Sequence, residues 1–337
     1  MAEPLLEVNN LKVHFPTEDG LVKAVDGVSF SVAPGETLGV VGESGSGKSV
    51  SFLTVMGLVT RKEARIQGEV VFRGQDLLKL PSEEMRHVRG AKISMIFQDP
   101  LTALNPVHRV GNQISEVFQV HRGLSNKEGF DEAVNLLQLV GIPQPRERAR
   151  QYPHEYSGGM RQRAMIAMAL ALNPDLLIAD EPTTALDVTV QAQILDLIDR
   201  MKEEFDAAVV LITHDLGVVA EHCDDIMVMY AGRIAEFGDR RDIYYGAHHP
   251  YTWGLMQSIS RIDQSRTERL RPIKGQPPSL IFVPPGCPFN PRCPYVMDIC
   301  RREVPQLLPV NGHHASACHL PIAEKERILS EEVLVRA

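Results

Sequence analysis

The hydrophobic pattern divides the chain into strand-like and helix-like stretches. Residues 5–15 and 21–32 are strand-like and flank the turn-forming stretch PTEDG, which predicts an antiparallel hairpin. Short apolar runs follow, and such runs are typical of strands that are buried on both faces. These runs lie in the segments ETLGVVG, EVVFRG, ISMIFQ, DLLIAD, AAVVLIT and DIMVMYAG.

Helical periodicity appears between several of these strands, most clearly in residues 159–172 and 188–205. Strands that alternate with helices predict an α/β fold with a mostly parallel sheet. Residues from about 99 to 160 have a helical and loop-rich pattern, so we expect an inserted helical subdomain there. Beyond about residue 261 proline is frequent and periodicity is lost. The sequence therefore predicts one domain over residues 1–260 and an extension over residues 261–337.

Composition narrows the function classes. Apolar residues make up 44% of the 337 residues and charged residues 23%, as in globular proteins with a sizeable core. The net charge of −8 argues against a nucleic-acid binder, which needs a basic footprint. No apolar stretch approaches the roughly 18 residues that a membrane span needs. The N-terminus has no signal-peptide pattern. We therefore expect a cytoplasmic protein whose role at a membrane, if it has one, is peripheral.

One glycine-rich segment indicates phosphate binding. Residues 42–49, GESGSGKS, match the pattern G-x-x-x-x-G-K-[ST] between an expected strand and an expected helix. Glycines let backbone N–H groups turn towards an anion, and the helix N-terminus adds its positive dipole end. Lys48 would contact the β- and γ-phosphates, and the Ser49 hydroxyl would be a ligand of Mg²⁺.

The apolar run over residues 176–179 ends in a pair of carboxylates, Asp180 and Glu181. Open parallel sheets bind ligands at the carboxyl ends of their strands. We expect Asp180 to hold Mg²⁺ through water. Glu181 would polarise the attacking water as a general base.

Further motifs occur in an order that resembles the ABC-type ATPases. Between the glycine loop and the acidic strand lies YSGGMRQR, which resembles the signature usually written LSGGQ, with Tyr156 and Met160 in place of Leu and Gln. Gln98 resembles the Q-loop residue, residues 185–187 the D-loop, and His214 the switch histidine. The chain is identified as a member of the ABC family over residues 36–215.

The resemblance implies the roles of the site residues. Two ATPase subunits would meet head to tail, so that Ser157 and Gly159 of one face the γ-phosphate held by the other. The implied catalytic residues are Glu181, His214, Gln98 and Lys48, and the implied Mg²⁺ ligands are Ser49, Gln98 and Asp180. The implied nucleotide-binding residues are Phe15, Gly42, Glu43, Ser44, Gly45, Ser46, Gly47, Lys48, Ser49, Val50, Gln98, Ser157, Gly158, Gly159, Asp180 and Asp187.

The resemblance becomes more specific near the C-terminus. The segments HPYT, GQPP and GCPFNPRCP resemble the ends of ATP-binding subunits of oligopeptide and dipeptide importers. The resemblance implies coupling of ATP hydrolysis to peptide uptake at the cytoplasmic face of the cell membrane. The implied partners are a second, related ATPase subunit, two transmembrane permease subunits and an extracytoplasmic peptide-binding protein.

Four of the five cysteines lie in this extension, at Cys287, Cys293, Cys300 and Cys318. Their spacing lacks the close pairs of zinc knuckles and suits a [4Fe–4S] cluster, with which the resembling families are associated. Structural Zn²⁺, with ligands among His313, His314 and His319, and free thiols or disulfides are the alternatives. A second hypothesis for the whole chain is a soluble ABC ATPase that acts in metal-cluster assembly or regulation. A third is a regulatory subunit with weak hydrolysis, against which Glu181 and His214 count.

Overall fold

The computed structural model describes residues 3–184, 186–258 and 273–334. Within these ranges the chain folds into two compact units. Of the described residues, the first comprises 3–5, 33–36, 79–184 and 186–212, and the second comprises 6–32, 37–78, 213–258 and 273–334. The boundary expected between residues 260 and 261 falls within residues 259–272, which lie outside the described ranges, and it stays a prediction.

The first unit combines a parallel group of strands with a set of helices. Strand β7 pairs in parallel with β6 on one side and with β8 on the other. Every residue of β7 is buried, as the continuous apolar run predicts for a strand covered on both faces. The strands are β6 (Ile93–Ile96), β7 (Leu176–Asp180) and β8 (Ala208–Thr213). The parallel pairing confirms the expected α/β class.

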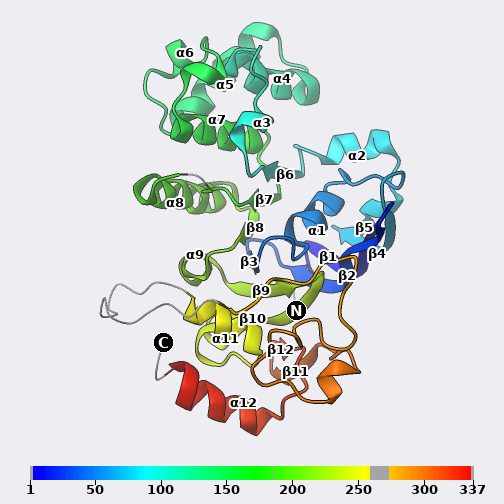
Figure 1. Ribbon diagram of the computed structural model, residues 1–337. Helices are drawn as coiled ribbons and strands as arrows, with labels where there is room; N and C mark the ends of the chain where they lie inside the picture. Colours follow the sequence, from blue (N-terminus) through cyan, green and yellow to red (C-terminus); the bar gives the residue numbers. More distant parts are fainter. Residues whose placement is uncertain (1–2, 185, 259–272, 335–337) are drawn as a thin grey trace. The chain divides into compact units, whose positions relative to one another are not determined.

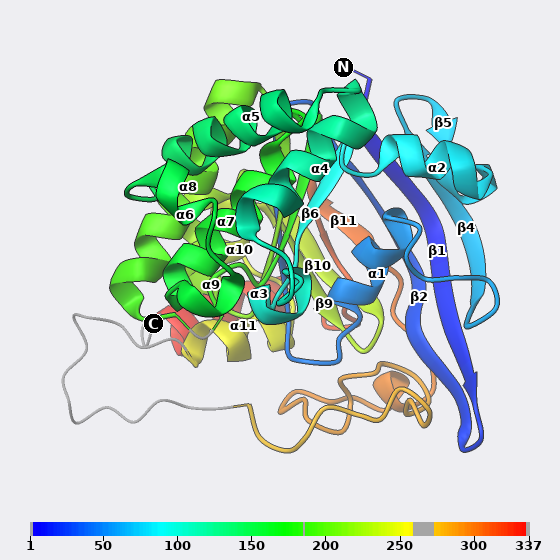
Figure 2. The same ribbon diagram turned by 90° about the horizontal axis from the view of Figure 1, so that it is seen from above.

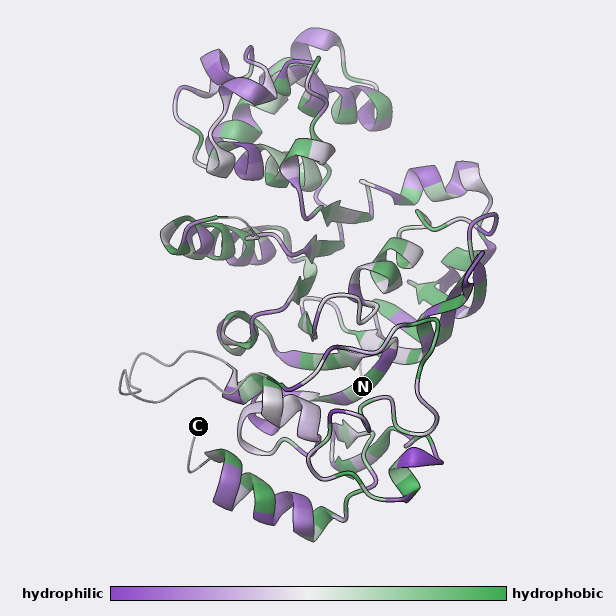
Figure 3. Ribbon diagram, in the orientation of Figure 1, coloured by the Kyte–Doolittle hydropathy of each residue, from purple (hydrophilic) through white to green (hydrophobic). Residues whose placement is uncertain are grey.

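Helices α3 to α7 of this unit gather in one group (Figure 1). Helices α3 to α6 lie in the stretch of about residues 99–160 where the sequence predicts a helical insertion, whereas α7 begins at its end and continues to Leu170; the bounds of the subdomain stay a prediction. Figure 3 shows both hydrophilic and hydrophobic residues around α8, whose residues Ile194, Leu197 and Ile198 are buried. The helices are α2 (Ser82–Val88), α3 (Pro100–Ala103), α4 (Val110–Arg122), α5 (Asn126–Leu139), α6 (Pro145–Arg148), the 3₁₀-helix η2 (Pro153–Glu155), α7 (Gly158–Leu170) and α8 (Val188–Phe205).

The second unit contains an antiparallel sheet of order β2-β1-β4-β5, and β1, β2 and β4 lie side by side in Figure 2. The pairing of β1 with β2 confirms the expected hairpin, in which Thr17 lies opposite Gly20. Four β1 side chains, Leu6, Val8, Leu11 and Val13, are completely buried. The elements are β1 (Leu6–Thr17), β2 (Gly20–Val32), β4 (Arg65–Phe72), β5 (Gln75–Asp76) and the 3₁₀-helix η1 (Leu77–Lys79).

A second group of strands completes this unit. Strand β3 (Thr37–Val41) pairs in parallel with β9 (Asp225–Tyr230), while β10 (Arg233–Asp239) pairs antiparallel with β9 and β12. The remaining elements are α1 (Lys48–Val55), α9 (Leu216–His222), α10 (Arg240–Tyr245), α11 (Pro250–Gln257), η3 (Ile299–Arg301), β11 (Leu308–Asn311), β12 (His314–Ser316), α12 (Ile322–Ile328) and the π-helix η4 (Leu329–Leu334). None of the described helices combines the length and apolar character that a bilayer crossing needs.

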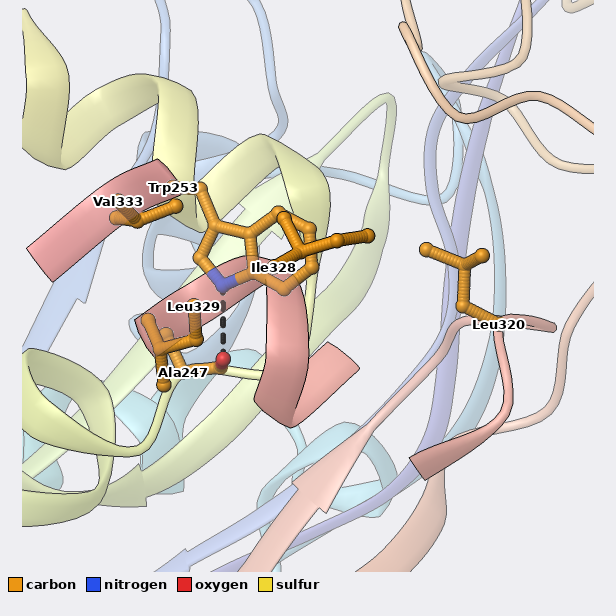
Figure 4. Packing of buried hydrophobic residues seen from close by; sticks show 6 residues of the cluster. All are labelled: Ala247, Trp253, Leu320, Ile328, Leu329 and Val333. Atoms are coloured by element: carbon orange, nitrogen blue, oxygen red, sulfur yellow. Dashed lines mark hydrogen bonds between the residues drawn. The ribbon is translucent and has the colours of Figure 1, made fainter. Parts of the chain in front are cut away.

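The described part of the extension is ordered against the rest of the second unit. Helix α12 and η4 bring Ile328, Leu329 and Val333 into a cluster with Trp253 of α11 (Figure 4). The Trp253 indole N–H donates to the Ala247 carbonyl at 2.7 Å. The regular elements in this extension were not predicted, because its many prolines interrupt any long periodic pattern.

Replacing Ile328 with alanine is expected to loosen the attachment of α12. Removal of a fully buried Ile side chain costs roughly 2–5 kcal/mol where the site cannot collapse. Trp253 is the only tryptophan of the chain, so its emission reports on this cluster. We expect emission to shift to the red at lower urea concentration than in the unchanged protein. Ile322→Ala on the same helix is the control, since Ile322 is 50% exposed. Equal shifts in both variants would contradict this account of the packing.

Buried histidine makes the stability of this unit depend on pH. His249 is 3% exposed and caps α11 by accepting a hydrogen bond from the Tyr251 amide at 3.0 Å. Burial lowers the pKa of His249 to about 4, with Glu236 raising it and Lys325 lowering it. Between that value and about 6.5, the unfolded chain binds a proton that the folded chain does not. Stability therefore falls as the pH drops through this window.

We expect the free energy of unfolding to fall by about 2 kcal/mol between pH 7 and pH 5 through His249 alone. His249→Asn keeps a capping acceptor but does not titrate in this range. Urea unfolding of this variant should therefore have a weaker pH dependence than that of the unchanged protein. An unaltered pH dependence would assign the effect to other groups.

Candidate nucleotide-binding site

The glycine loop connects β3 to α1 in the second unit, as the sequence predicts. Three of its glycines have positive φ, 153° at Gly42, 76° at Gly45 and 100° at Gly47. A Cβ atom at Gly42 would lie 2.3 Å from the Met229 carbonyl oxygen. All three glycines therefore have a backbone conformation that L-residues rarely adopt, and such a conformation lets amides face an anion.

Lys48 begins α1 and its side chain returns to the loop. Its ammonium donates to the carbonyl of Gly42 at 2.7 Å and to that of Glu43 at 3.1 Å, and the residue is 5% exposed. The Ser46 hydroxyl is buried and has no hydrogen-bond partner among the described residues. The buried Lys48 ammonium and the unsatisfied Ser46 hydroxyl lie in one turn, and both can donate hydrogen bonds to phosphate oxygens.

The carboxylate Glu181 follows β7 in the first unit. Its backbone has φ of 47°, and its amide donates to Ile212 at 2.9 Å. The Gln98 amide group donates to Glu181 Oε2 at 2.7 Å, and the Thr184 hydroxyl donates to the same atom at 2.9 Å. The structure therefore brings two sequence-predicted residues, Gln98 and Glu181, together across 83 positions of the chain. Thr184 was not predicted as a site residue, although it lies between the predicted residues Glu181 and Asp187 in the segment EPTTALD.

Two further predicted residues of this unit are helix caps. Ser157 is exposed and caps α7 by accepting from the Met160 amide at 3.3 Å. Asp187 caps α8 by accepting from the Val190 amide at 3.0 Å. Gly158 is exposed and Gly159 is half-buried, so the signature turn is open to a partner. Tyr156, at the position where the family usually has Leu, is buried, and burial raises its pKa to about 12.

The other predicted residues lie in the expected elements. Asp180 ends β7 and is 6% exposed, while His214 is exposed after β8. Phe15 is a half-buried residue of β1 opposite Val22. Ser49 and Val50 lie in the first turn of α1, and Ser44 lies exposed in the loop. Gln98 and Asp180 belong to the first unit and Ser49 to the second. Their shared Mg²⁺ site and the adenine contact of Phe15 stay predictions.

Two residues that contact the loop were not predicted as site residues. The amide of Glu43 donates to the Tyr251 hydroxyl at 2.8 Å, and its carboxylate accepts two hydrogen bonds from Arg292. Both residues lie in the segments HPYT and GCPFNPRCP, which carried the resemblance to peptide importers. Nothing in the local pattern indicates that these segments return to the glycine loop.

The four cysteines of the extension lie in one region of the second unit. Cys287 and Cys300 are buried, and the Cys287 amide donates to the Cys300 carbonyl at 2.8 Å. Burial raises the pKa of Cys287 to about 11, that of Cys293 to about 12 and that of Cys318 as well, and mutual repulsion of the thiolates adds to each shift. The described cysteines are free thiols and form no disulfide, so of the alternative of free thiols or disulfides only the free thiols agree with the structure. Cys223, outside this region, is also buried.

The described side chains do not form a metal site in this structure. No group of three or more His, Cys, Asp or Glu side chains among the described residues is arranged to hold a metal ion. The histidines considered as zinc ligands have other partners. His313 contacts Asp225 at 2.8 Å, His314 contacts Glu236 at 2.9 Å and His319 contacts the Glu303 carbonyl at 2.9 Å. The expected iron–sulfur or zinc site is therefore not supported by this geometry.

Comparison with known proteins agrees with the motifs. Residues 25–184 match the family described as ABC transporter, and residues 235–300 match the family described as oligopeptide/dipeptide transporter, C-terminal region. The oligopeptide transport ATP-binding protein OppD of Salmonella typhimurium is 52% identical over 323 residues, which cover 96% of each chain. The dipeptide transport ATP-binding protein DppD of Bacillus subtilis is 53% identical over 319 residues, 94% of this chain and 95% of the relative.

A solved structure supports the fold. The ATP-binding cassette MJ0796, in a dimeric post-hydrolysis state bound to ADP and Pi, aligns with a TM-score of 0.63. The alignment covers 70% of this chain and 99% of that chain at 27% identity. The part that aligns is of the size of the expected ATPase domain, and the family expected from the motifs is confirmed.

Proposed function

Because this chain belongs to the ATP-binding subunits of oligopeptide and dipeptide ABC transporters, we propose that it couples ATP hydrolysis to peptide uptake. The observation that carries the ATPase assignment is the glycine loop, where Lys48 and the positive end of α1 would bind phosphate. The peptide cargo rests on relatives that match nearly the whole chain. The hypothesis of a soluble ATPase in metal-cluster assembly is not favoured, since these relatives are transport proteins.

The nucleotide would be held by the loop over residues 42–50. Backbone amides and Lys48 would bind the phosphates, and Ser49 with Asp180 would hold Mg²⁺. Mg²⁺ would neutralise charge on the β- and γ-phosphates while bound. Phe15 would stack on adenine. The unsatisfied Ser46 hydroxyl supports this proposal, because a phosphate oxygen would give it a partner.

Hydrolysis would depend on Glu181. Its carboxylate would accept a proton from water as that water attacks the γ-phosphate. The hydrogen bonds from Gln98 and Thr184 to Oε2 fix the orientation of the group. Gln98 would also link the γ-phosphate to the helical subdomain. His214 would align the attacking water. The short Gln98–Glu181 distance supports a joint role of these two residues.

Two such subunits would enclose the nucleotides. The exposed turn of Ser157, Gly158 and Gly159 would face the γ-phosphate on the partner, and Asp187 would lie at the shared interface. The dimeric state given for the aligned cassette supports this arrangement. The partner would be a related ATPase subunit, as peptide importers of this family would pair two such chains on two permeases.

The helical subdomain would dock on two transmembrane permease subunits at the cytoplasmic face of the membrane. An extracytoplasmic peptide-binding protein would deliver the cargo. Reconstitution tests the whole proposal: the chain, its companion subunits and the binding protein in liposomes should take up labelled peptide only with MgATP. ATP-independent uptake, or purification of the chain without any membrane-spanning companion, would overturn it.

We also propose that Cys287, Cys293, Cys300 and Cys318 hold a [4Fe–4S] cluster. Electrostatic interactions link all four side chains pairwise, so the thiols lie near one another. The raised pKa values of Cys287, Cys293 and Cys318 disfavour their thiolates unless a cation is present. In a cluster each cysteine binds a separate iron, so the sulfurs lie farther apart than around a single ion. The lack of a group arranged around one ion, among the residues that the structure describes, therefore counts more against zinc than against a cluster.

Anaerobic purification tests the cluster. We expect brown protein whose broad visible absorbance is bleached by dithionite, and about four irons per chain by metal analysis. Cys300→Ala should lose the colour, whereas Cys223→Ala should keep it. Colourless protein with one zinc per chain would replace the cluster by structural zinc.

A further inference from the structure

A partly buried ion pair joins the extension to the phosphate-binding loop. Arg292 Nη1 lies 2.6 Å from Glu43 Oε2, and Arg292 Nη2 lies 2.9 Å from Glu43 Oε1. The two side chains are 4% and 28% exposed, and the residues are 249 positions apart. Two parallel hydrogen bonds between a guanidinium and a carboxylate fix both orientation and charge, which a lysine cannot reproduce.

Contacts other than Glu43, within the extension and on β9, also hold Arg292 in place. Arg292 Nε donates to the Lys274 carbonyl at 3.1 Å, and Nη1 also lies 3.3 Å from the Tyr230 hydroxyl. The guanidinium carbon lies 5.8 Å from the ring centre of Tyr230 and 6.0 Å from that of Phe289. Because these contacts order the side chain in advance, little conformational entropy is lost when it binds Glu43.

Glu43 makes three separate contacts, through its amide, its carbonyl and its carboxylate. Its amide donates to the Tyr251 hydroxyl at 2.8 Å, and its carbonyl accepts from Lys48 Nζ at 3.1 Å. Its carboxylate is bound by Arg292. A shift of Glu43 would therefore also move the carbonyl that Lys48 contacts.

The charge of Glu43 is unfavourable where it stands. Residues 42–49 are expected to bind the triphosphate, and a carboxylate on the same loop repels an anion. Arg292 offsets that negative charge with a cation that is fixed and largely shielded from water. Without Arg292, the carboxylate would oppose nucleotide binding and would lack its buried partner.

We propose that Arg292 is a positioning residue for nucleotide binding: it neutralises and orients Glu43, so that the cysteine-bearing segment sets the affinity of the loop for ATP. This inference rests on the proposed binding of ATP at residues 42–49. It makes the C-terminal segment a part of the nucleotide site rather than a separate appendage. Arg292 would not contact the nucleotide itself.

Calorimetric titration of the full-length chain with MgATP and MgADP tests this role. We expect Arg292→Met to weaken binding by about tenfold or more, and Arg292→Lys to weaken it less, since the charge is kept. Glu43→Gln removes the repelling charge, so it is the background in which the effect of Arg292→Met should become small. In the double variant Glu43→Gln/Arg292→Met, most of the lost affinity should return. The control is Arg301→Met, an exposed arginine of the same segment, which should leave affinity unchanged.

The double variant shows whether Arg292 acts by offsetting the charge of Glu43 or only by holding the loop in place. A residue that only holds the loop in place would give a double variant as weak as Arg292→Met, and that result would overturn the inference. Unchanged affinity in a folded Arg292→Met protein would do the same. If Arg292→Met does not fold, a large loss of affinity in Glu43→Gln would contradict the charge role. Failure of the unchanged protein to bind MgATP would instead refute the proposed function.

Discussion

Glu181→Gln is expected to lower the rate of ATP hydrolysis by about 10²- to 10⁴-fold, the range that a lost general base costs. The amide has the same shape as the carboxylate and can still accept the hydrogen bonds from Gln98 and Thr184. Binding of MgATP should therefore be retained. The bound nucleotide would persist between two subunits, so the variant should accumulate as a nucleotide-bound dimer.

Steady-state hydrolysis, nucleotide titration and size-exclusion chromatography with MgATP measure the three parts of this expectation. Glu203→Gln is a matched control, because Glu203 is an exposed carboxylate of α8 in the same unit. It should leave all three unchanged. Normal turnover by Glu181→Gln would remove Glu181 as the general base and would direct attention to another proton acceptor.

Local signals were sufficient for the elements that carry the site. The periodic stretch over residues 188–205 is helix α8 itself, and the apolar run that ends in Asp180 is β7. These elements could be predicted because hydrophobic period and length decide them within a few residues. The glycine loop was equally predictable, since its conformation follows from glycines at fixed spacing before a helix.

Contacts between distant segments were not predictable in the same way. The ion pair between Glu43 and Arg292 spans 249 positions, and neither residue stands in a pattern that marks the other as its partner. Helix α12 was missed because it has only seven residues and follows a segment rich in proline and loops. The cysteines were recognised as a group, but their separations in space depend on how that irregular segment folds.

Gly47→Ala is expected to weaken MgATP binding by about a hundredfold. Gly47 has φ of 100°, and a Cβ atom there would lie 2.3 Å from the carbonyl oxygen of Ala24 in β2. A left-handed backbone costs an L-residue roughly 1–2 kcal/mol, and overpacking adds roughly 1–3 kcal/mol. The loop would relieve both by leaving the conformation that turns its amides inward. Restoring that conformation on binding would cost about 3 kcal/mol, which corresponds to about a hundredfold in affinity.

Gly45→Ala separates the two contributions. Gly45 also has positive φ, 76°, but no atom lies within 4 Å of the position that its Cβ would occupy. Only the backbone cost applies, so we expect a loss of affinity of about tenfold. Titration with MgATP, together with thermal melting to show that both variants fold, gives the comparison. Similar affinities for the two variants would mean that the loop does not need the close approach of Gly47 to β2, and that the amides reach the phosphates by another path.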